Sequence, residues 1–115
     1  MDPRLKSKIQ IDNLFTQGKS HFAFPIKLIY LHSGDNAQKG IQFAVSVSKK
    51  RFKNATDRNK IKRRMREAVR SQLNSIDKDN VKYVSLLLIY VGQEILDFNR
   101  ISKSTIRLFD KLKLL

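Results

Sequence analysis

The chain has 115 residues, a formal net charge of +14 and no cysteine. Its length suits one domain with a modest core, and its 41% hydrophobic content is typical of a globular protein rather than a disordered one. The lack of cysteine excludes a disulfide framework and a thiolate metal site, and is compatible with the cytoplasm. The pI near 10.4 favours a nucleic acid as the partner, with an anionic membrane surface second.

We expect a single domain over residues 1–115, in which residues 1–7 are polar, basic and flexible. The N-terminus has no apolar run of the kind found in a signal peptide. The longest apolar run, residues 86–91, is far too short to span a bilayer. A membrane is therefore not an expected partner.

The first part of the chain predicts a short helix and two strands. Residues 8–15 form the helix, and Gly18 can end it in the left-handed conformation. Residues 22–31 alternate between two faces, but Pro25 cannot donate a ladder hydrogen bond, so this strand lies at an edge or begins after the proline. Residues 41–48 alternate in the same way. We expect these two strands to form an antiparallel pair.

The next stretch, residues 49–70, holds eleven basic residues against two acidic ones, so +9 of the formal +14 lies in about a fifth of the chain. Asn54 is a plausible N-cap of a helix here, with Asp57 in the first turn or acting as the cap itself. Apolar residues follow at helical spacing: Ile61, Met65, Ala68, Val69, Leu73 and Ile76. Asn59, Arg63, Arg66 and Arg70 fall together on a different arc.

This helix can therefore pack on a core with one face and present guanidinium groups on another. A solvated helix that is basic by chance is the simplest alternative. Crowded charges of one sign repel one another and destabilise the free protein, so a polyanionic partner explains them better.

The last third of the chain predicts a strand and a helix. Residues 83–91 are almost continuously apolar, which indicates a central strand covered on both faces. Asn99 or Ser102 can cap the last helix, whose apolar stripe is Ile101, Thr105, Leu108, Phe109, Leu112 and Leu115. The order α-β-β-α-β-α, with room for an extra short strand, predicts an α+β two-layer sandwich in which three helices pack on a small mixed sheet of about four strands.

No catalytic constellation is evident in the sequence. His21 and His32 have neither a nearby cysteine nor an obvious carboxylate partner, and the four glycines are too scattered for a phosphate-binding loop. We therefore expect no catalytic, cofactor-binding or metal-binding residues. The chain has the character of a binding protein.

The segment NATDRNKIKRRMREA, residues 54–68, resembles the signature of the bacterial ribonuclease P protein component. The context is also similar, because Phe15 precedes Gly18, a strand reaches Tyr30, and VSKK stands just before the motif. The resemblance covers roughly residues 8–112. Thr56 departs from the usual valine. Lys60 departs from the usual arginine, which keeps the charge but loses the bidentate fork.

The resemblance implies the protein subunit of a ribonucleoprotein that removes the 5′ leader from precursor tRNA. The RNA subunit performs the hydrolysis with Mg²⁺, which it mainly holds itself. The expected partners are that RNA and precursor tRNA with its leader, with no protein partner. The implied fold is ribosomal-protein-like, with a left-handed β-α-β crossover that runs against the general rule.

Carried over by position, the motif and its flanks imply two sets of site residues. The RNA-binding set is Lys49, Lys50, Lys53, Asn54, Arg58, Asn59, Lys60, Lys62, Arg63, Arg66 and Arg70. The set that would line a cleft for the leader is Ile11, Phe15, Leu28, Tyr30 and Ser46. The family commonly has an aromatic residue where this chain has Ile11, so we expect weaker stacking there.

Three rival interpretations remain open at the level of the sequence. The first is another small basic RNA-binding protein of ribosomal type, without a processing role. The second is a helix that reads the DNA major groove, against which the strand-rich pattern argues. The third is a metal-dependent nuclease that acts alone, for which the sequence lacks a carboxylate cluster.

Overall fold

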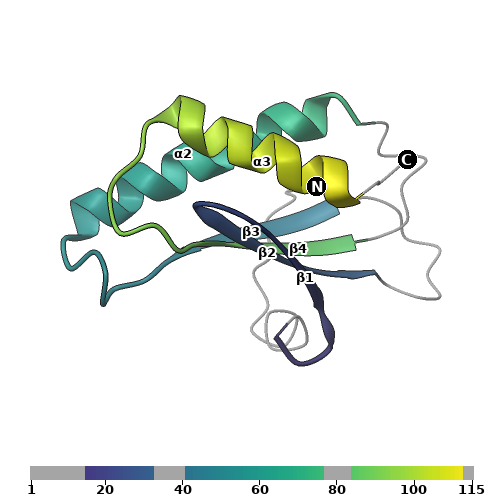
Figure 1. Cartoon of the computed structure of the whole chain (residues 1–115), viewed down its shortest axis with the longest axis horizontal. Helices are drawn as coiled ribbons and strands as arrows, with labels where there is room; N and C mark the ends of the chain where they lie inside the picture. Colours follow the sequence, from purple (N-terminus) through teal and green to yellow (C-terminus); the bar gives the residue numbers. More distant parts are fainter. Residues whose placement is uncertain (1–14, 33–40, 77–83, 113–115) are drawn as a thin grey trace.

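The computed structural model describes residues 15–32, 41–76 and 84–112. Residues 15–17 are helical, whereas the rest of the predicted first helix and the N-terminus predicted to be flexible lie outside the described residues. The elements that follow are β1 (Lys19–Ala23), β2 (Ile26–His32), β3 (Ile41–Val47), α2 (Ala55–Asn74), β4 (Val84–Tyr90) and α3 (Phe98–Leu112) (Figure 1).

The four strands form one mixed sheet in the order β1-β2-β4-β3. β1 pairs antiparallel with β2, β2 pairs antiparallel with β4, and β3 pairs parallel with β4. The prediction that residues 22–31 and 41–48 pair with each other is therefore wrong, because β4 lies between them. The apolar sequence of β4 (VSLLLIY) suits a strand with neighbours on both sides, which leaves β3 at an edge.

Pro25 divides the predicted strand 22–31 into two strands. Phe24 and Pro25, joined by a cis peptide bond, form the turn between β1 and β2. The turn returns the chain so that Ala23 pairs with Ile26 and Lys19 pairs with Tyr30. The extra short strand is thus β1, and the proline lies outside the ladder as its missing N–H requires.

Both helices cover one face of the sheet, α2 on the β3 side and α3 on the β1 side (Figure 1). The predicted apolar face of α2 is confirmed, since Ile61, Met65, Ala68, Val69 and Leu73 are buried. They pack in one core with alternate residues of the strands, including Ile26, Leu28, Phe43, Leu86 and Leu88. The chain runs from β3 through α2 to the parallel strand β4. The left-handed sense of that crossover stays a prediction.

Helix α3 begins earlier than its predicted caps. The Asp97 carboxylate accepts a hydrogen bond from the backbone N–H of Arg100 at 2.9 Å, so Asp97 is the cap and Asn99 and Ser102 are not. The predicted stripe is buried from Ile101 to Leu112, and Leu115 lies outside the described residues. No helix within the described ranges is long and apolar enough to cross a membrane.

The other face of the sheet carries a second, smaller cluster. Ile29 and Leu87 are buried there, with Leu31, Ala44 and Ile89 partly buried around them. Side chains alternate along each strand, so this face takes the residues that the helix-covered face leaves. The prediction that β4 is covered on both faces agrees with its burial pattern, in which Val84 to Leu88 are all buried.

Candidate RNA interface

The loop between β3 and α2 is anchored by one apolar side chain. Phe52 is 7% exposed and packs against the ring of Tyr90 at a centroid distance of 5.9 Å. Its backbone N–H donates to the Ser48 carbonyl at 3.1 Å. Phe52 points into the core, whereas its neighbours Lys49, Lys50 and Lys53 are exposed to solvent. Their contact with RNA stays a prediction.

Arg58 has a structural role that the sequence did not predict. Its Nη1 donates to the carbonyl of Phe52 at 2.7 Å and to the carbonyl of Lys53 at 3.0 Å. The guanidinium therefore ties the basic loop to the first turn of α2, on the apolar side of the helix. Arg58 is half-buried and positions the loop, and its direct contact with RNA stays a prediction.

Asn54 is likewise occupied by the fold. Its side-chain oxygen accepts the backbone N–H of Thr56 at 2.9 Å, which confirms Asn54 as the N-cap of α2. Asp57 is then the third helical residue, where its charge suits the positive end of the helix dipole. The Asn54 amide oxygen is thus used in starting the helix, and the contact of this residue with RNA stays a prediction.

The remaining predicted residues of α2 differ in their exposure. Asn59, Lys60, Arg63 and Arg70 are exposed, and Lys62 and Arg66 are half-buried. We call Arg63, Arg66 and Arg70 the outer arginines. By helical geometry they spread over about 10 Å of the axis, on the flank turned away from α3 and towards the β3 edge. Only Asp57 and Glu67 oppose the seven basic residues of this helix.

Two arginines that the sequence did not assign to any role fix the segment after β4. Arg64 Nη1, on the α3 side of α2, donates to the Leu96 carbonyl at 2.7 Å. Arg51 Nη1 donates to the Val91 carbonyl. Nothing in the sequence separates Arg64 from its neighbour Arg63 except helical phase, which places the two on different flanks.

Tyr90 completes this set of contacts. Its hydroxyl donates to the Glu94 carbonyl at 2.6 Å and accepts the Leu96 N–H at 3.2 Å. Burial raises the pKa of Tyr90 above its ordinary value of 10.0. The hydroxyl therefore stays protonated and keeps its donor in the neutral range.

The five residues predicted to line a leader cleft do not share one face of the sheet. Leu28 is fully buried in the core under the helices, so we correct its assignment. Tyr30 faces the same side but is half-buried, and its ring stacks on His21 at 5.1 Å. Ser46 pairs with Ile89 on the opposite face, and Phe15 is 59% exposed. Ile11 lies outside the described residues.

A hollow of about 420 Å³ lies at the end of β4, and a second one of about 340 Å³ lies beside Tyr30. The second hollow is lined by Gln17, Lys19, Tyr30, Leu31 and Leu112. Two of these lining residues, Gln17 and Lys19, follow the exposed Phe15 closely in the sequence. In the part of the chain that the structure describes, no group of three or more His, Cys, Asp or Glu side chains is placed to hold a metal ion.

Comparisons with known proteins agree with one another. Residues 2–113 match the family model described as Ribonuclease P. The Ribonuclease P protein component of Porphyromonas gingivalis is 31% identical over 104 residues, covering 88% of this chain and 76% of the relative. The fold is similar to the RNase P proteins of Staphylococcus aureus (TM-score 0.79, 21% identity, 99% of this chain and 98% of that one) and Thermotoga maritima (TM-score 0.76, 23%, 94% and 96%).

Proposed function

The chain belongs to the ribonuclease P protein family, and we propose from this premise that its outer arginines bind RNA phosphates while Phe15 and the hollow beside Tyr30 contact the precursor tRNA leader. Membership makes the chain a subunit of the endoribonuclease that matures tRNA 5′ ends together with an RNA subunit. It has no catalytic residue of its own in this proposal.

The one-sided charge of α2 is the observation that carries the proposal. The helix buries Ile61 and Met65 completely and leaves the outer arginines on the opposite arc. Three guanidinium groups on one rigid helix can contact successive phosphates with little loss of side-chain freedom. Release of the counterions condensed on the RNA then favours binding, so affinity should fall steeply with salt.

The leader contact rests on a separate set of residues. Phe15 is 59% exposed, and the hollow beside Tyr30 offers an aromatic wall and the ammonium group of Lys19. A single strand is held by stacking on flat side chains and by cations along its phosphates. We therefore assign the leader to the hollow beside Tyr30 rather than to Leu28.

Mg²⁺ belongs with the RNA subunit in this proposal. The protein neutralises phosphates where substrate and RNA subunit meet, which lowers their mutual repulsion and hence the Mg²⁺ concentration that cleavage needs. The assembled ribonucleoprotein would act in the cytoplasm, which is consistent with a chain that lacks cysteine.

The leader assignment is tested by measuring how tightly the reconstituted ribonucleoprotein binds precursor tRNAs with one-nucleotide and eight-nucleotide leaders. The longer leader should bind more tightly, and Phe15→Ala or Tyr30→Ala should remove part of that advantage, worth about 1–3 kcal/mol per stacked base. Ile106→Ala is the matched control, because Ile106 is an exposed apolar residue on α3 that does not line this hollow. An advantage that both aromatic variants retain in full would disprove the leader assignment.

A further inference from the structure

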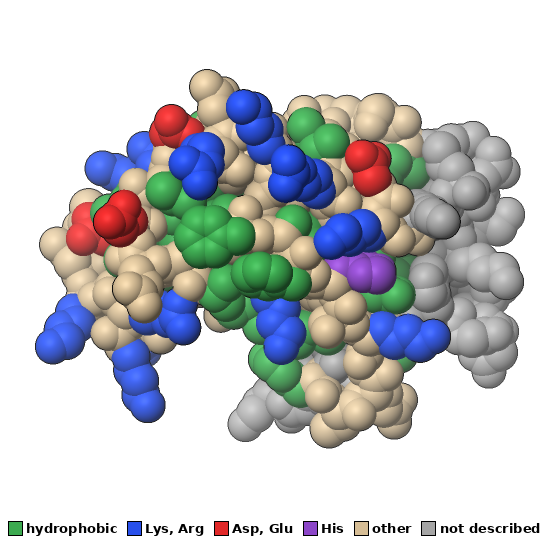
Figure 2. Space-filling model, in the orientation of Figure 1, with side chains coloured by type: hydrophobic (Ala, Val, Ile, Leu, Met, Phe, Trp, Pro, Cys, Tyr) green, Lys and Arg blue, Asp and Glu red, His purple; other side chains and the backbone are tan. Residues whose placement is uncertain are grey.

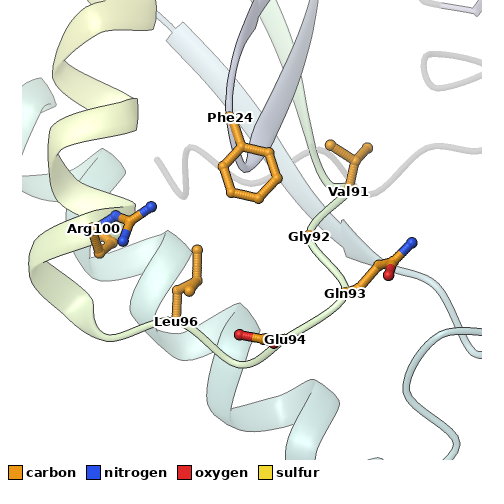
Figure 3. A pocket seen from close by; sticks show the side chains of 7 residues that line it. All are labelled: Phe24, Val91, Gly92, Gln93, Glu94, Leu96 and Arg100. Carbon is orange, nitrogen blue, oxygen red and sulfur yellow. The ribbon is translucent and has the colours of Figure 1, made fainter.

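The hollow at the end of β4 lies away from the outer arginines, on the α3 side of the molecule. It is lined by Phe24, Val91, Gly92, Gln93, Glu94, Leu96 and Arg100. Figure 3 shows the Phe24 ring reaching into it from the β1–β2 turn and the Arg100 side chain reaching towards it from α3. The β1–β2 turn thus meets a stretch of chain far from it in sequence, residues 91–100, around a space of about 420 Å³, within the usual size range of ligand sites.

The wall of this hollow is held in place although it has no regular secondary structure. The carbonyls of Val91, Glu94 and Leu96 each accept a side-chain hydrogen bond, from Arg51, Tyr90 and Arg64 respectively. The Val91 N–H also donates to the Pro25 carbonyl at 2.8 Å, which joins this wall to the β1–β2 turn. The hollow is therefore formed before any ligand arrives, so a ligand would not have to order it.

Two large aromatic side chains are exposed at this end of the molecule. Phe24 is 56% exposed and Phe22 is 54% exposed. Figure 2 shows hydrophobic side chains gathered near the middle of this face, with Lys and Arg side chains around them. Exposed aromatic patches rimmed by polar groups commonly mark interaction sites.

The charges beside these rings favour an anionic ligand. Arg100 lines the hollow, and Arg107 and Lys111 continue along the same flank of α3. Lys111 Nζ donates to the Phe22 carbonyl at 2.8 Å, which places this basic flank against the outer edge of β1. Glu94 is the one carboxylate among the lining residues, and its oxygens can accept hydrogen bonds from a ligand.

We propose that this hollow binds an unpaired nucleotide of single-stranded RNA, with its base against Phe24 and its phosphate at Arg100. An aromatic face beside a guanidinium group is the combination that holds single strands without base pairing. Glu94 can accept a hydrogen bond from an exocyclic amino group, so the hollow should prefer cytidine, which has one, to uridine, which does not. The proposal shares with the proposed function only the assumption that the ligand is RNA, because it involves none of the outer arginines.

The test uses a fluorescent reporter in the full-length protein. The chain has no tryptophan, so Phe24→Trp gives a single tryptophan at an exposed position, which can be excited selectively over the three tyrosines. We expect hexacytidylate to quench this emission in a saturable way and to bind about tenfold more tightly than hexauridylate or an abasic ribose-phosphate oligomer. Ile106→Trp, on α3 but outside the hollow, is the control and should respond weakly to all of them.

Second substitutions in the reporter locate the phosphate. Arg100→Gln should weaken hexacytidylate binding about tenfold, whereas Lys103→Gln removes the same charge from the same helix outside the hollow and should have a much smaller effect. The proposal would be overturned if the two variants had equal effects. It would also be overturned if the abasic oligomer or anionic lipid vesicles quenched the emission as strongly as hexacytidylate does, or if raising the protein concentration alone quenched it. The reporter should still respond when Arg63 and Arg66 are both replaced by Gln, which separates failure of this site from failure of the α2 interface.

Discussion

The outer side of α2 and the hollow beside α3 both present arginine, but they are built differently. The outer arginines come from one helix and lie within eight consecutive residues. The hollow takes Phe24 from a turn, Glu94 from an irregular segment and Arg100 from α3. The first surface is a track of charge suited to a phosphate backbone, and the second is an open hollow of a size suited to one base.

The difference teaches that charge alone does not identify an RNA contact in this protein. Among the arginines of α2, Arg58 and Arg64 each donate a guanidinium hydrogen bond to a backbone carbonyl and thereby fix the neighbouring loops. Arg63, only one residue from Arg64, lies on the exposed side. The helical phase of each arginine therefore decides whether it holds the fold or faces a ligand.

The largest effect on RNA binding is expected from replacing all three outer arginines with Gln. Each lost phosphate contact should reduce the slope of log affinity against log salt by about one unit, so the triple variant should lose about three. Filter binding to a ribonuclease P RNA over a range of salt concentrations measures the slope. A triple variant with the slope of the wild type would show that α2 is not the interface.

A smaller effect is expected from Arg63→Ala alone. One fewer phosphate contact should lower the slope by about one unit. The helix itself should be unaffected, since Arg63 is exposed and alanine is the best helix former. The measurement is the same titration, with the circular dichroism of the variant as a check on folding. Unchanged affinity and slope would remove Arg63 from the interface.

Arg64→Ala should lower the stability of the fold more than it lowers the salt dependence of RNA binding. The Leu96 carbonyl loses a charged donor, so the free energy of unfolding should fall by about 1.5–3 kcal/mol, while the salt slope changes far less than in Arg63→Ala. Urea denaturation of the two variants side by side tests this contrast. Equal stability together with an equal loss of slope would mean that helical phase does not separate the two roles.

Tyr90→Phe should have the smallest effect on RNA binding and should act on stability. The segment after β4 loses a hydrogen bond to Glu94 and one from Leu96, each worth about 1 kcal/mol. Because burial raises the pKa of Tyr90 in the folded state, its stabilisation is fully present below the unfolded value of 10.0 and is lost as the pH rises through the folded value. Urea denaturation should be measured below pH 10 and above the folded pKa of Tyr90. The free energy of unfolding of the wild type should lose the contribution of Tyr90 between these two pH values, whereas Tyr90→Phe has no such contribution to lose.

The sequence predicts most of what lies within single elements. The N-cap Asn54, the apolar face of α2 and the buried run of β4 follow from local chemistry and periodicity, and the structure confirms each of them. The pairing of strands was predicted wrongly, because two consecutive strands with a turn-rich link look like a hairpin. The almost continuously apolar sequence of β4 suits a central strand, and in the sheet β4 lies between β2 and β3.

The candidate site could be predicted only in part for the same reason. The outer arginines share one helix, so spacing reveals them. Leu28 was predicted to line the cleft, but it is buried under the helices. The next residue along the strand, Ile29, lies on the other face of the sheet, because side chains alternate between the two faces. The hollow beside α3 gives no sequence signal, because Phe24 is far in sequence from its other lining residues, which lie within residues 91–100.

The central claim is tested most directly by cleavage of precursor tRNA at low Mg²⁺. A bacterial ribonuclease P RNA would be assayed alone, with the wild-type protein and with the triple variant of the outer arginines. We predict that the wild type restores cleavage at a Mg²⁺ concentration where the RNA alone is nearly inactive, and that the triple variant does so poorly until Mg²⁺ is raised. Stimulation by both proteins to the same extent, or by neither, would contradict the account.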